Sequence, residues 1–330
     1  MSGIGRATNG HLPVKLDAEK PLKHGHPTLN QDSSETSVNT AGHTLFRPPA
    51  EAGSVLVRVA DGCPHNACAF CAMYTGVPYR EYATEELTAC IAEAARKHPH
   101  ARRVFLADGD VFALPRETLS AVLALLRASF PRLARVNCYA SARAMMNKSE
   151  YDLLSLRQAG LHTLYLGLES GSEAVLKLMR KGTSALDMVK GCQRVQRAGL
   201  NISVMVLIGL GGQKHSAEHI DGTVQTLNAM QPQLLSCLRL VPVAGTLLAR
   251  WIRAGHFVPL TEVEAVLELR AIIQGLELGQ SVFRADHASN ILPLAGRLPK
   301  DKDRLLAELD ELLGCGVLDG AGPGIMPSLL

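Results

Sequence analysis

The stretch "SVLVRVADGCPHNACAFCAMY" covers residues 54–74 and joins an apolar, β-rich run to a loop with three cysteines. The run over residues 54–60 has the β-branched composition that is typical of a buried strand. The cysteines follow at Cys63, Cys68 and Cys71, so three of the chain's eight cysteines lie in one loop. In a protein from a reducing compartment, such a close-set group of cysteines indicates a metal or cluster site rather than a disulfide framework.

Composition and charge narrow the class of protein. The chain has 330 residues, 47% of them hydrophobic, which is enough to bury a large α/β core. The net charge is +3, aromatic residues make up 4%, and no Lys/Arg block occurs, so the sequence shows no clear nucleic-acid surface. No apolar run reaches membrane-spanning length and the first residues lack the apolar segment of a secretory signal. We therefore expect a cytoplasmic protein with no membrane partner.

Beyond the cysteine loop, apolar β-rich runs alternate with amphipathic helical patterns. We expect strands within residues 54–60, 102–110, 135–142, 162–171, 201–212 and 234–245. Strands that are apolar on both faces and alternate with helices predict a parallel sheet, either open and doubly wound or curved into a barrel. The unbroken succession favours an α/β fold that is a partial (β/α)6 TIM-like barrel with a C-terminal helical extension.

The expected boundaries divide the chain into three parts. Residues 1–43 are polar and unpatterned, and we expect a disordered or loosely attached arm. Residues 44–250 should form the core barrel, and residues 251–330 a helical extension that covers it. Short unusual motifs end the expected strands: "DGD" (108–110), "ESG" (169–171), "GLGG" (209–212) and "PVAG" (242–245). Because parallel strands end on one face, these motifs and the cysteine loop should form one site.

Two kinds of metal site compete for the three cysteines. A structural zinc site needs four protein ligands, usually in two pairs, and the sequence offers no second pair, although His65 lies between the first two cysteines. An iron–sulfur cubane suits the pattern better, because three thiolates can hold three irons and leave the fourth open for a small molecule. Phe70 would place an aromatic ring at the mouth of such a cluster, or would simply anchor the loop. The scattered cysteines, expected to be buried small hydrophobes, are Cys90, Cys138, Cys192, Cys237 and Cys315.

These motifs resemble those of the radical S-adenosylmethionine (SAM) enzymes. The spacing here is C-x4-C-x2-C, one residue longer than the C-x3-C-x2-C that is commonest in that superfamily. The segment "LYLGLESGSEAVLKLMRKG" (164–182) is similar to the one after the fourth strand in the branch with oxygen-independent coproporphyrinogen oxidases, methylthiotransferases and elongator-type enzymes. "RPPAEA", "GLGG" and "FRADHASNILPL" resemble an uncharacterised bacterial group of that branch with the longer spacing. The resemblance covers residues 44–314.

The resemblance implies a 4Fe-4S cluster held by Cys63, Cys68 and Cys71, with SAM bound to the open iron. Reduction would cleave SAM and give a 5′-deoxyadenosyl radical that abstracts hydrogen from a small-molecule substrate. A reductant such as flavodoxin or ferredoxin would be the partner, and the reaction class, oxidoreductase or transferase, stays open. Two alternatives also remain: a non-catalytic iron–sulfur protein for electron transfer or sensing, and a haem-handling protein that kept the fold but lost radical chemistry.

Candidate SAM contacts lie at the expected strand ends. SAM carries a cationic amine and sulfonium, so carboxylates are favourable there, and a glycine allows close backbone approach. The resemblance adds an adenine-contacting segment on the fifth strand. The candidates are Asp110, Gly109, Glu169, Ile208, Gly209, Ser203 and Arg239, the last two suiting a structural role as well.

The segment "RADHASN" (284–290) gathers polar side chains between apolar neighbours. His287 titrates near neutral pH and Asp286 precedes it, so the pair suits substrate binding or general acid–base chemistry. A hydrogen-bonded loop latch is the alternative. In either case we expect this segment to fold back over the barrel rather than form a core strand.

Overall fold

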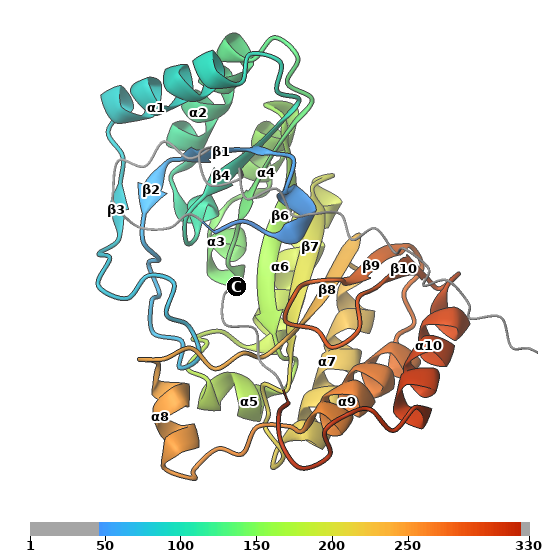
Figure 1. The fold of residues 1–330 in the computed structure, drawn as a ribbon. Helices are drawn as coiled ribbons and strands as arrows, with labels where there is room; N and C mark the ends of the chain where they lie inside the picture. Colours follow the sequence, from blue (N-terminus) through green and yellow to red (C-terminus); the bar gives the residue numbers. More distant parts are fainter. Residues whose placement is uncertain (1–45, 325–330) are drawn as a thin grey trace, which may run out of the picture. The chain divides into compact units, whose positions relative to one another are not determined.

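The computed structural model describes residues 46–324, whose main sheet has the strand order β1-β4-β5-β6-β7-β8-β9-β10 (Figure 1). The first six strands are parallel neighbours in chain order: β1 (Val55–Arg58), β4 (Arg103–Ala107), β5 (Arg135–Tyr139), β6 (Leu161–Glu169), β7 (Asn201–Ile208) and β8 (Leu234–Arg239). This arrangement confirms the mixed α/β fold of a partial TIM-like barrel. The arm predicted for residues 1–43 lies outside the described residues.

Helices link these strands. They are α1 (Thr84–Lys97), α2 (Arg116–Ser129), α3 (Ala142–Asn147), α4 (Glu150–Gln158), α5 (Glu173–Leu178), α6 (Ala185–Arg197) and α7 (Ser216–Met230), with short 3-10 turns η2 (Pro49–Glu51) and η3 (Val111–Ala113). Serines begin four of them, because each side chain accepts a hydrogen bond from a first-turn amide: Ser141, Ser149, Ser172 and Ser184. The helices bury their apolar faces against one side of the sheet.

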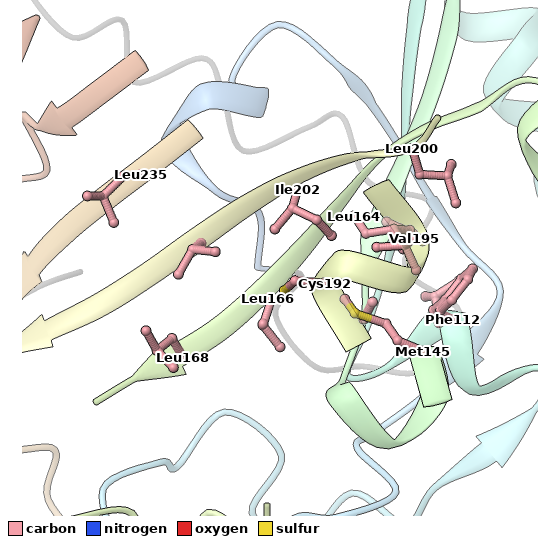
Figure 2. Packing of buried hydrophobic residues seen from close by; sticks show 14 of the residues in the cluster. Phe112, Met145, Leu164, Leu166, Leu168, Cys192, Val195, Leu200, Ile202 and Leu235 are labelled. Atoms are coloured by element: carbon pink, nitrogen blue, oxygen red, sulfur yellow. The ribbon is translucent and has the colours of Figure 1, made fainter. Parts of the chain in front are cut away.

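Figure 2 shows this packing around α6, whose Cys192 and Val195 lie beside Leu164 of β6 and Ile202 of β7. Cys192 is fully buried there as a small apolar side chain. Cys90, Cys138 and Cys237 are buried as well. Cys315 is exposed, which corrects the expectation for that residue: it follows the last helix, where no element covers it.

The other side of the sheet is its inner face. At β1, β4, β5 and β6 it is filled by a separate apolar cluster that includes Phe105, with Tyr139 and Tyr165 at ring-centroid distances of 4.9 and 5.4 Å. Glu51 lies buried beside this cluster and accepts hydrogen bonds from Asn137 (2.7 Å) and from the Tyr165 hydroxyl. The inner face is therefore closed by packing on this half of the sheet.

The C-terminal part adds strands as well as helices. Besides α8 (Leu247–Arg253), α9 (Glu262–Gly275) and α10 (Lys302–Gly314), it contains β9 (Ser281–Ala285), parallel to β8, and β10 (Leu294–Leu298), antiparallel to β9. The expectation that the segment around "RADHASN" forms no core strand was wrong, because β9 includes its first residues. Phe283 is fully buried and Arg284 half-buried, so β9 has the two-residue period of a strand with one open face.

Within residues 46–324, no helix combines the length and the apolar character needed to cross a membrane.

Candidate active site

The cysteine loop leaves the sheet after β1 and is closed at its base by the small strands β2 (Ala60–Asp61) and β3 (Arg80–Glu81). Asp61 accepts hydrogen bonds from Arg80 (3.0 Å) and from the Tyr82 hydroxyl (2.8 Å) across this pair. The strand pair and its carboxylate therefore hold together the two ends of the loop that carries the three cysteines.

Two helix ends anchor the middle of the loop. The Ala69 amide donates to the Met179 carbonyl at the end of α5 (2.9 Å), and the Ala69 carbonyl accepts from the Leu248 amide in the first turn of α8 (2.8 Å). Both partners are groups that a helix terminus leaves without an internal partner. Phe70 packs, partly buried, against the apolar cluster that α5 and α8 form beneath the loop, so the structure gives it an anchoring contact. All three cysteines are half-buried.

The turn after β4 packs directly on the loop. A Cβ atom at Gly109 would lie 2.3 Å from the Gly62 carbonyl oxygen and 2.5 Å from the Cα of Cys63. Asp108, at φ 82°, forms a buried ion pair with Arg58 of β1 (2.7 Å) that holds the turn in place. Only a residue without a side chain fits at position 109, so the glycine brings two backbones together at Cys63.

Asp110 faces α3 and is almost fully buried. One carboxylate oxygen accepts from the Ser141 amide (3.0 Å) and the other from the Ser141 hydroxyl. Burial raises the pKa of Asp110, and the hydrogen bonds from Ser141 oppose this rise. Because both oxygens are engaged, the side chain fixes the turn after β4 to the start of α3.

Glu169 ends β6 and forms an ion pair with Lys181, which follows α5 (3.0 Å). The two side chains are only 14% and 18% exposed. A Cβ at Gly167 would lie 2.1 Å from a Glu169 carboxylate oxygen and 3.1 Å from the Lys181 Nζ, so the pair lies folded over the inner face of the strand. The charges of both residues act on Cys68 and Cys71, which places the pair beside the cysteine loop.

Burial has the largest effect on the pKa of Cys68 and Cys71. It raises the pKa of Cys68 to about 11, with the Lys181 ammonium opposing the rise. Burial also raises the pKa of Cys71, where a hydrogen bond with the Met73 backbone opposes it. A thiol must lose its proton to bind a metal, and Lys181 favours that charge. Among residues 46–324 no three His, Cys, Asp or Glu side chains converge to hold a single metal ion, whereas a cubane takes one thiolate at each iron.

A buried polar network supports the turn after β7. The Gly209 amide (φ 86°) donates to the Glu268 carboxylate of α9 at 2.6 Å, and the Ser216 hydroxyl donates to the other oxygen. His219 of α7 lies between this carboxylate and Ser170 at the end of β6, with its Nδ1 2.8 Å from the Ser170 hydroxyl. Burial lowers the pKa of His219 to about 4 and raises that of Glu268 to about 7. The network joins the ends of β6 and β7 through two helices.

Two predicted cofactor residues lie on the helix side of the sheet. Ile208 belongs to the core under the helices, and Arg239 donates a hydrogen bond to the Pro323 carbonyl (3.3 Å). Leu207, one position earlier, faces inward and packs on the same apolar cluster as Phe70. Strand alternation sets which residue faces inward, and on this strand it is Leu207 and not Ile208, the residue that the resemblance suggested. Ser203 does face inward, opposite Tyr165, and is buried.

The inner face of β7, β8 and β9 is open, unlike that of the earlier strands. Apart from the buried Ser203, its side chains are half-buried, while those on the helix side of the same strands are buried. Its members are Met205, Leu207, Ser236, Leu238, Val282 and Arg284. This half of the inner face, together with the cysteine loop, is where a bound molecule would find accessible side chains.

The polar segment after β9 lies at the same edge of the sheet as the other strand ends. Ser289 accepts from the Arg239 amide (3.2 Å) and Asn290 donates to the Cys237 carbonyl (2.8 Å), so both hold the segment to β8. Asp286 is exposed and pairs with Arg284 (2.8 Å). His287 accepts at Nδ1 from the Ser289 amide (3.1 Å), which leaves Nε2 as the N–H donor of the neutral ring.

Sequence reasoning missed Arg58, Lys181 and Leu207. A single arginine inside the apolar run "VLVRVA" was a usable signal, because a buried strand position holds a charge only when it is paired. Lys181 stands in a quoted motif but has no local pattern, since its partner Glu169 precedes it by a whole helix.

The site geometry agrees with a family match. The model of the Radical SAM superfamily matches residues 57–227, more than half of the chain, and the chain belongs to this superfamily. It is therefore an enzyme, and the cofactors of its family are a 4Fe-4S cluster and SAM, as predicted.

Individual relatives are distant. A tRNA uridine(34) acetyltransferase of Methanocaldococcus infernus is 22% identical in an alignment of 303 positions that covers 80% of this chain and 54% of that protein. The structure of methylornithine synthase (16% identity, TM-score 0.48) aligns over 68% of this chain and 63% of its own chain. The structure of coproporphyrinogen III oxidase of Escherichia coli (16% identity, TM-score 0.47) aligns over 79% of this chain and 52% of its own chain. The chain thus spans about half the length of the curated relative that it matches.

Proposed function

We propose that Cys63, Cys68 and Cys71 hold the 4Fe-4S cluster and that the enzyme cleaves SAM reductively to act on a small-molecule substrate. The observation that carries the proposal is the placement of three half-buried thiols in one loop, beside the close-packed Gly109 turn and the Glu169–Lys181 pair at one edge of the sheet. When bound and reduced, the cluster supplies the electron that breaks a C–S bond of SAM, which yields methionine and the 5′-deoxyadenosyl radical that removes hydrogen from the substrate.

The residues around the thiols suit the charged groups of SAM. Glu169 and Lys181 already neutralise each other, so they can exchange partners: the carboxylate binds the methionine ammonium and the lysine binds the methionine carboxylate. Because such an exchange keeps every charge paired, the desolvation of each group is compensated. Asp110 acts through the turn after β4, which it fixes to α3, and Gly109 lets that turn approach the loop.

The nucleoside part of SAM suits the end of β7. Gly209 adopts a positive φ, which favours glycine. Leu207 presents an inward-facing apolar side chain that packs on the same apolar cluster as Phe70. Ser203 stands further down the same face of the strand. We assign Leu207 the packing role that the resemblance implied for Ile208.

The substrate site is proposed on the open inner face of β7, β8 and β9, which offers apolar and polar side chains to a molecule of limited size. Ser236 and Arg284 are neighbours across β8 and β9 and supply polar contacts there. His287 presents an Nε2 proton from a ring that Ser289 holds in one tautomer, so it suits a donor to the substrate or a general acid. Asp286 orients Arg284 through their ion pair.

The test replaces one cysteine in anaerobically purified protein. Cys68→Ala should lose the visible absorbance of the cluster and all formation of 5′-deoxyadenosine from SAM under dithionite, because one iron loses its thiolate. Cys90→Ala, a buried cysteine in the helix core, is the matched control and should keep both.

Two outcomes contradict parts of this proposal. A Cys68→Ala enzyme with full iron and activity would remove Cys68 from the ligand set. A wild-type protein that binds a cluster but forms no 5′-deoxyadenosine with SAM and reductant would favour the electron-transfer, sensing or haem-handling alternatives.

A further inference from the structure

A small cleft opens at the N-terminal edge of the sheet, where β5 and β6 begin. Its volume is about 280 Å³, and the last turn of α2 forms one of its sides. Arg127 and Arg135 line it, together with Pro131, Leu133 and Gly160. The cysteine loop and the other strand ends lie at the opposite, C-terminal edge, because the first six strands are parallel. The cleft is therefore separate from the candidate active site.

The charges on the segments around this cleft are all positive. Residues 98–103, 127–135, 157–162 and 197–201 lead into the starts of β4, β5, β6 and β7, and they contain no aspartate or glutamate. Their exposed arginines are Arg102, Arg127, Arg132, Arg135, Arg157 and Arg197. The ion pairs among residues 46–324 include none of these six side chains. The fold thus gathers at one edge cations that are scattered along the sequence.

This positive charge acts on the groups that lie within the edge. Arg103 and Arg135 are register partners on the neighbouring parallel strands β4 and β5, so two like charges begin adjacent strands and repel each other. Burial lowers the pKa of the half-buried His162 on β6. The charges of Arg135 and Arg157 lower that pKa further, and the Glu51 carboxylate opposes them. An anion bound at this edge would reduce the repulsion among these cations.

We propose that this cleft binds a small organic phosphate, whose phosphate group contacts Arg127 and Arg135 and whose carbon skeleton packs on Pro131 and Leu133. A guanidinium group can bind phosphate through two parallel hydrogen bonds, which makes arginine well suited to this anion. Pro131 is exposed and Leu133 is partly exposed, so the apolar wall of the cleft is accessible to a ligand. The volume of the cleft suits a small molecule rather than a polymer.

Arg127 is held at the cleft by the chain that leads into β6. Its Nη2 donates to the Gln158 carbonyl (3.3 Å). A Cβ atom at Gly160 would lie 2.8 Å from the same nitrogen, so the glycine leaves the space that the guanidinium occupies. This contact uses one of the five N–H groups of the guanidinium and leaves the others for an anion. The backbone thus fixes the position of one arginine before a ligand binds, which lowers the entropy cost of binding.

The experiment measures binding to the full-length, cluster-loaded protein by titration calorimetry and by thermal unfolding. The probes are phenyl phosphate and its phosphate-free counterpart phenol, neither of which contains the adenine of SAM. The double variant Arg127→Gln/Arg135→Gln removes both cations of the cleft, and Arg135→Gln is tested alone because Arg127 also holds Gln158. The control variant Lys177→Gln/Arg250→Gln makes the same change in net charge on α5 and α8 at the opposite edge, where both side chains are exposed.

We expect the wild type and the control variant to bind phenyl phosphate, more weakly as salt is added, and to unfold at a higher temperature in its presence. The double variant should bind it at least about tenfold more weakly, and Arg135→Gln should show a smaller loss.

The proposal is overturned if the wild type does not bind phenyl phosphate, if phenol binds equally well, or if the control variant loses as much affinity as the double variant. A uridine oligonucleotide that binds far more tightly than phenyl phosphate, with an affinity that rises with its length, also overturns it. The ligand would then be the backbone of a nucleic acid rather than a small molecule.

Discussion

At the residue scale, the most constrained position of the site is Gly109, although it has no side chain that could react or bind a ligand. Its missing side chain lets the turn after β4 touch the backbone of Gly62 and Cys63. The neighbouring Asp108–Arg58 pair is buried and keeps the turn from moving away. A backbone contact of this kind cannot yield as a flexible side chain could.

Replacing this glycine tests how tightly the turn and the loop are coupled. Gly109→Ala should displace Cys63, because the added Cβ would lie 2.3 Å from the Gly62 oxygen. We expect a folded protein with an unchanged circular dichroism spectrum but with most of its bound iron lost. Gly314→Ala, in α10 with no atom near the added Cβ, should keep its iron. Full iron content in Gly109→Ala would show that the loop does not rest on this turn.

At the element scale, α9 is more than a cover for the sheet. Its Glu268 holds the Gly209 turn of β7, and His219 of α7 links the same carboxylate to the end of β6. The pKa of Glu268 is raised to about 7, chiefly by burial; hydrogen bonds from Ser216 and Gly209 oppose the rise and the nearby Glu264 carboxylate adds to it. The folded protein therefore favours a protonated Glu268 near neutral pH.

This shift predicts a pH-dependent stability. Since the folded pKa is above the unfolded value of about 4.5, the stability contributed by Glu268 is fully present below pH 4.5 and is lost as pH rises through about 7. Glu268→Gln removes that loss and keeps an acceptor for the Gly209 amide. Its unfolding free energy relative to wild type should increase by roughly 3 kcal/mol between pH 4.5 and pH 8 in urea titrations.

The control is Glu264→Gln, one turn earlier on α9. Hydrogen bonds from Thr261 and Gln213 outweigh burial and lower the pKa of Glu264, so its substitution should change stability in the opposite direction with pH, and less strongly. A Glu268→Gln difference that is the same at both pH values would mean that folding does not shift the pKa of Glu268.

At the scale of the whole molecule, the C-terminal segment belongs to the main sheet. Phe283 of β9 is fully buried in the same core as β7, α7 and α9, whereas its neighbour Val282 lies half-buried on the inner face. The last two strands are therefore part of the main hydrophobic core and not a separate unit on its surface.

Truncating these two neighbours tests that view. Phe283→Ala should lower the unfolding free energy by about 3–5 kcal/mol, and Val282→Ala by about 1 kcal/mol, in urea unfolding followed by fluorescence and circular dichroism. Both probes should shift together because one core is involved. A Phe283→Ala protein with only a local, early transition would mean that β9 and β10 unfold as a separate unit.

Local sequence physics determined the parallel alternation of β1 and β4 to β8 and the gathering of three cysteines after the first strand. Both follow from short-range patterns: apolar runs, helix caps and the spacing of thiols in one loop. The superfamily could be named for the same reason, because its cysteine motif is contiguous in sequence.

Only the tertiary structure decided which side chains meet. Lys181 reaches Glu169 because α5 returns the chain to the end of β6, and Leu207 rather than Ile208 faces inward because the pairing register of β7 fixes its faces. Residues 281–285 became a strand because the free edge of β8 offered a partner, although the polar "RADHASN" motif that overlaps the strand's end suggested a loop. These outcomes depend on contacts between residues far apart in the chain, which no local pattern encodes.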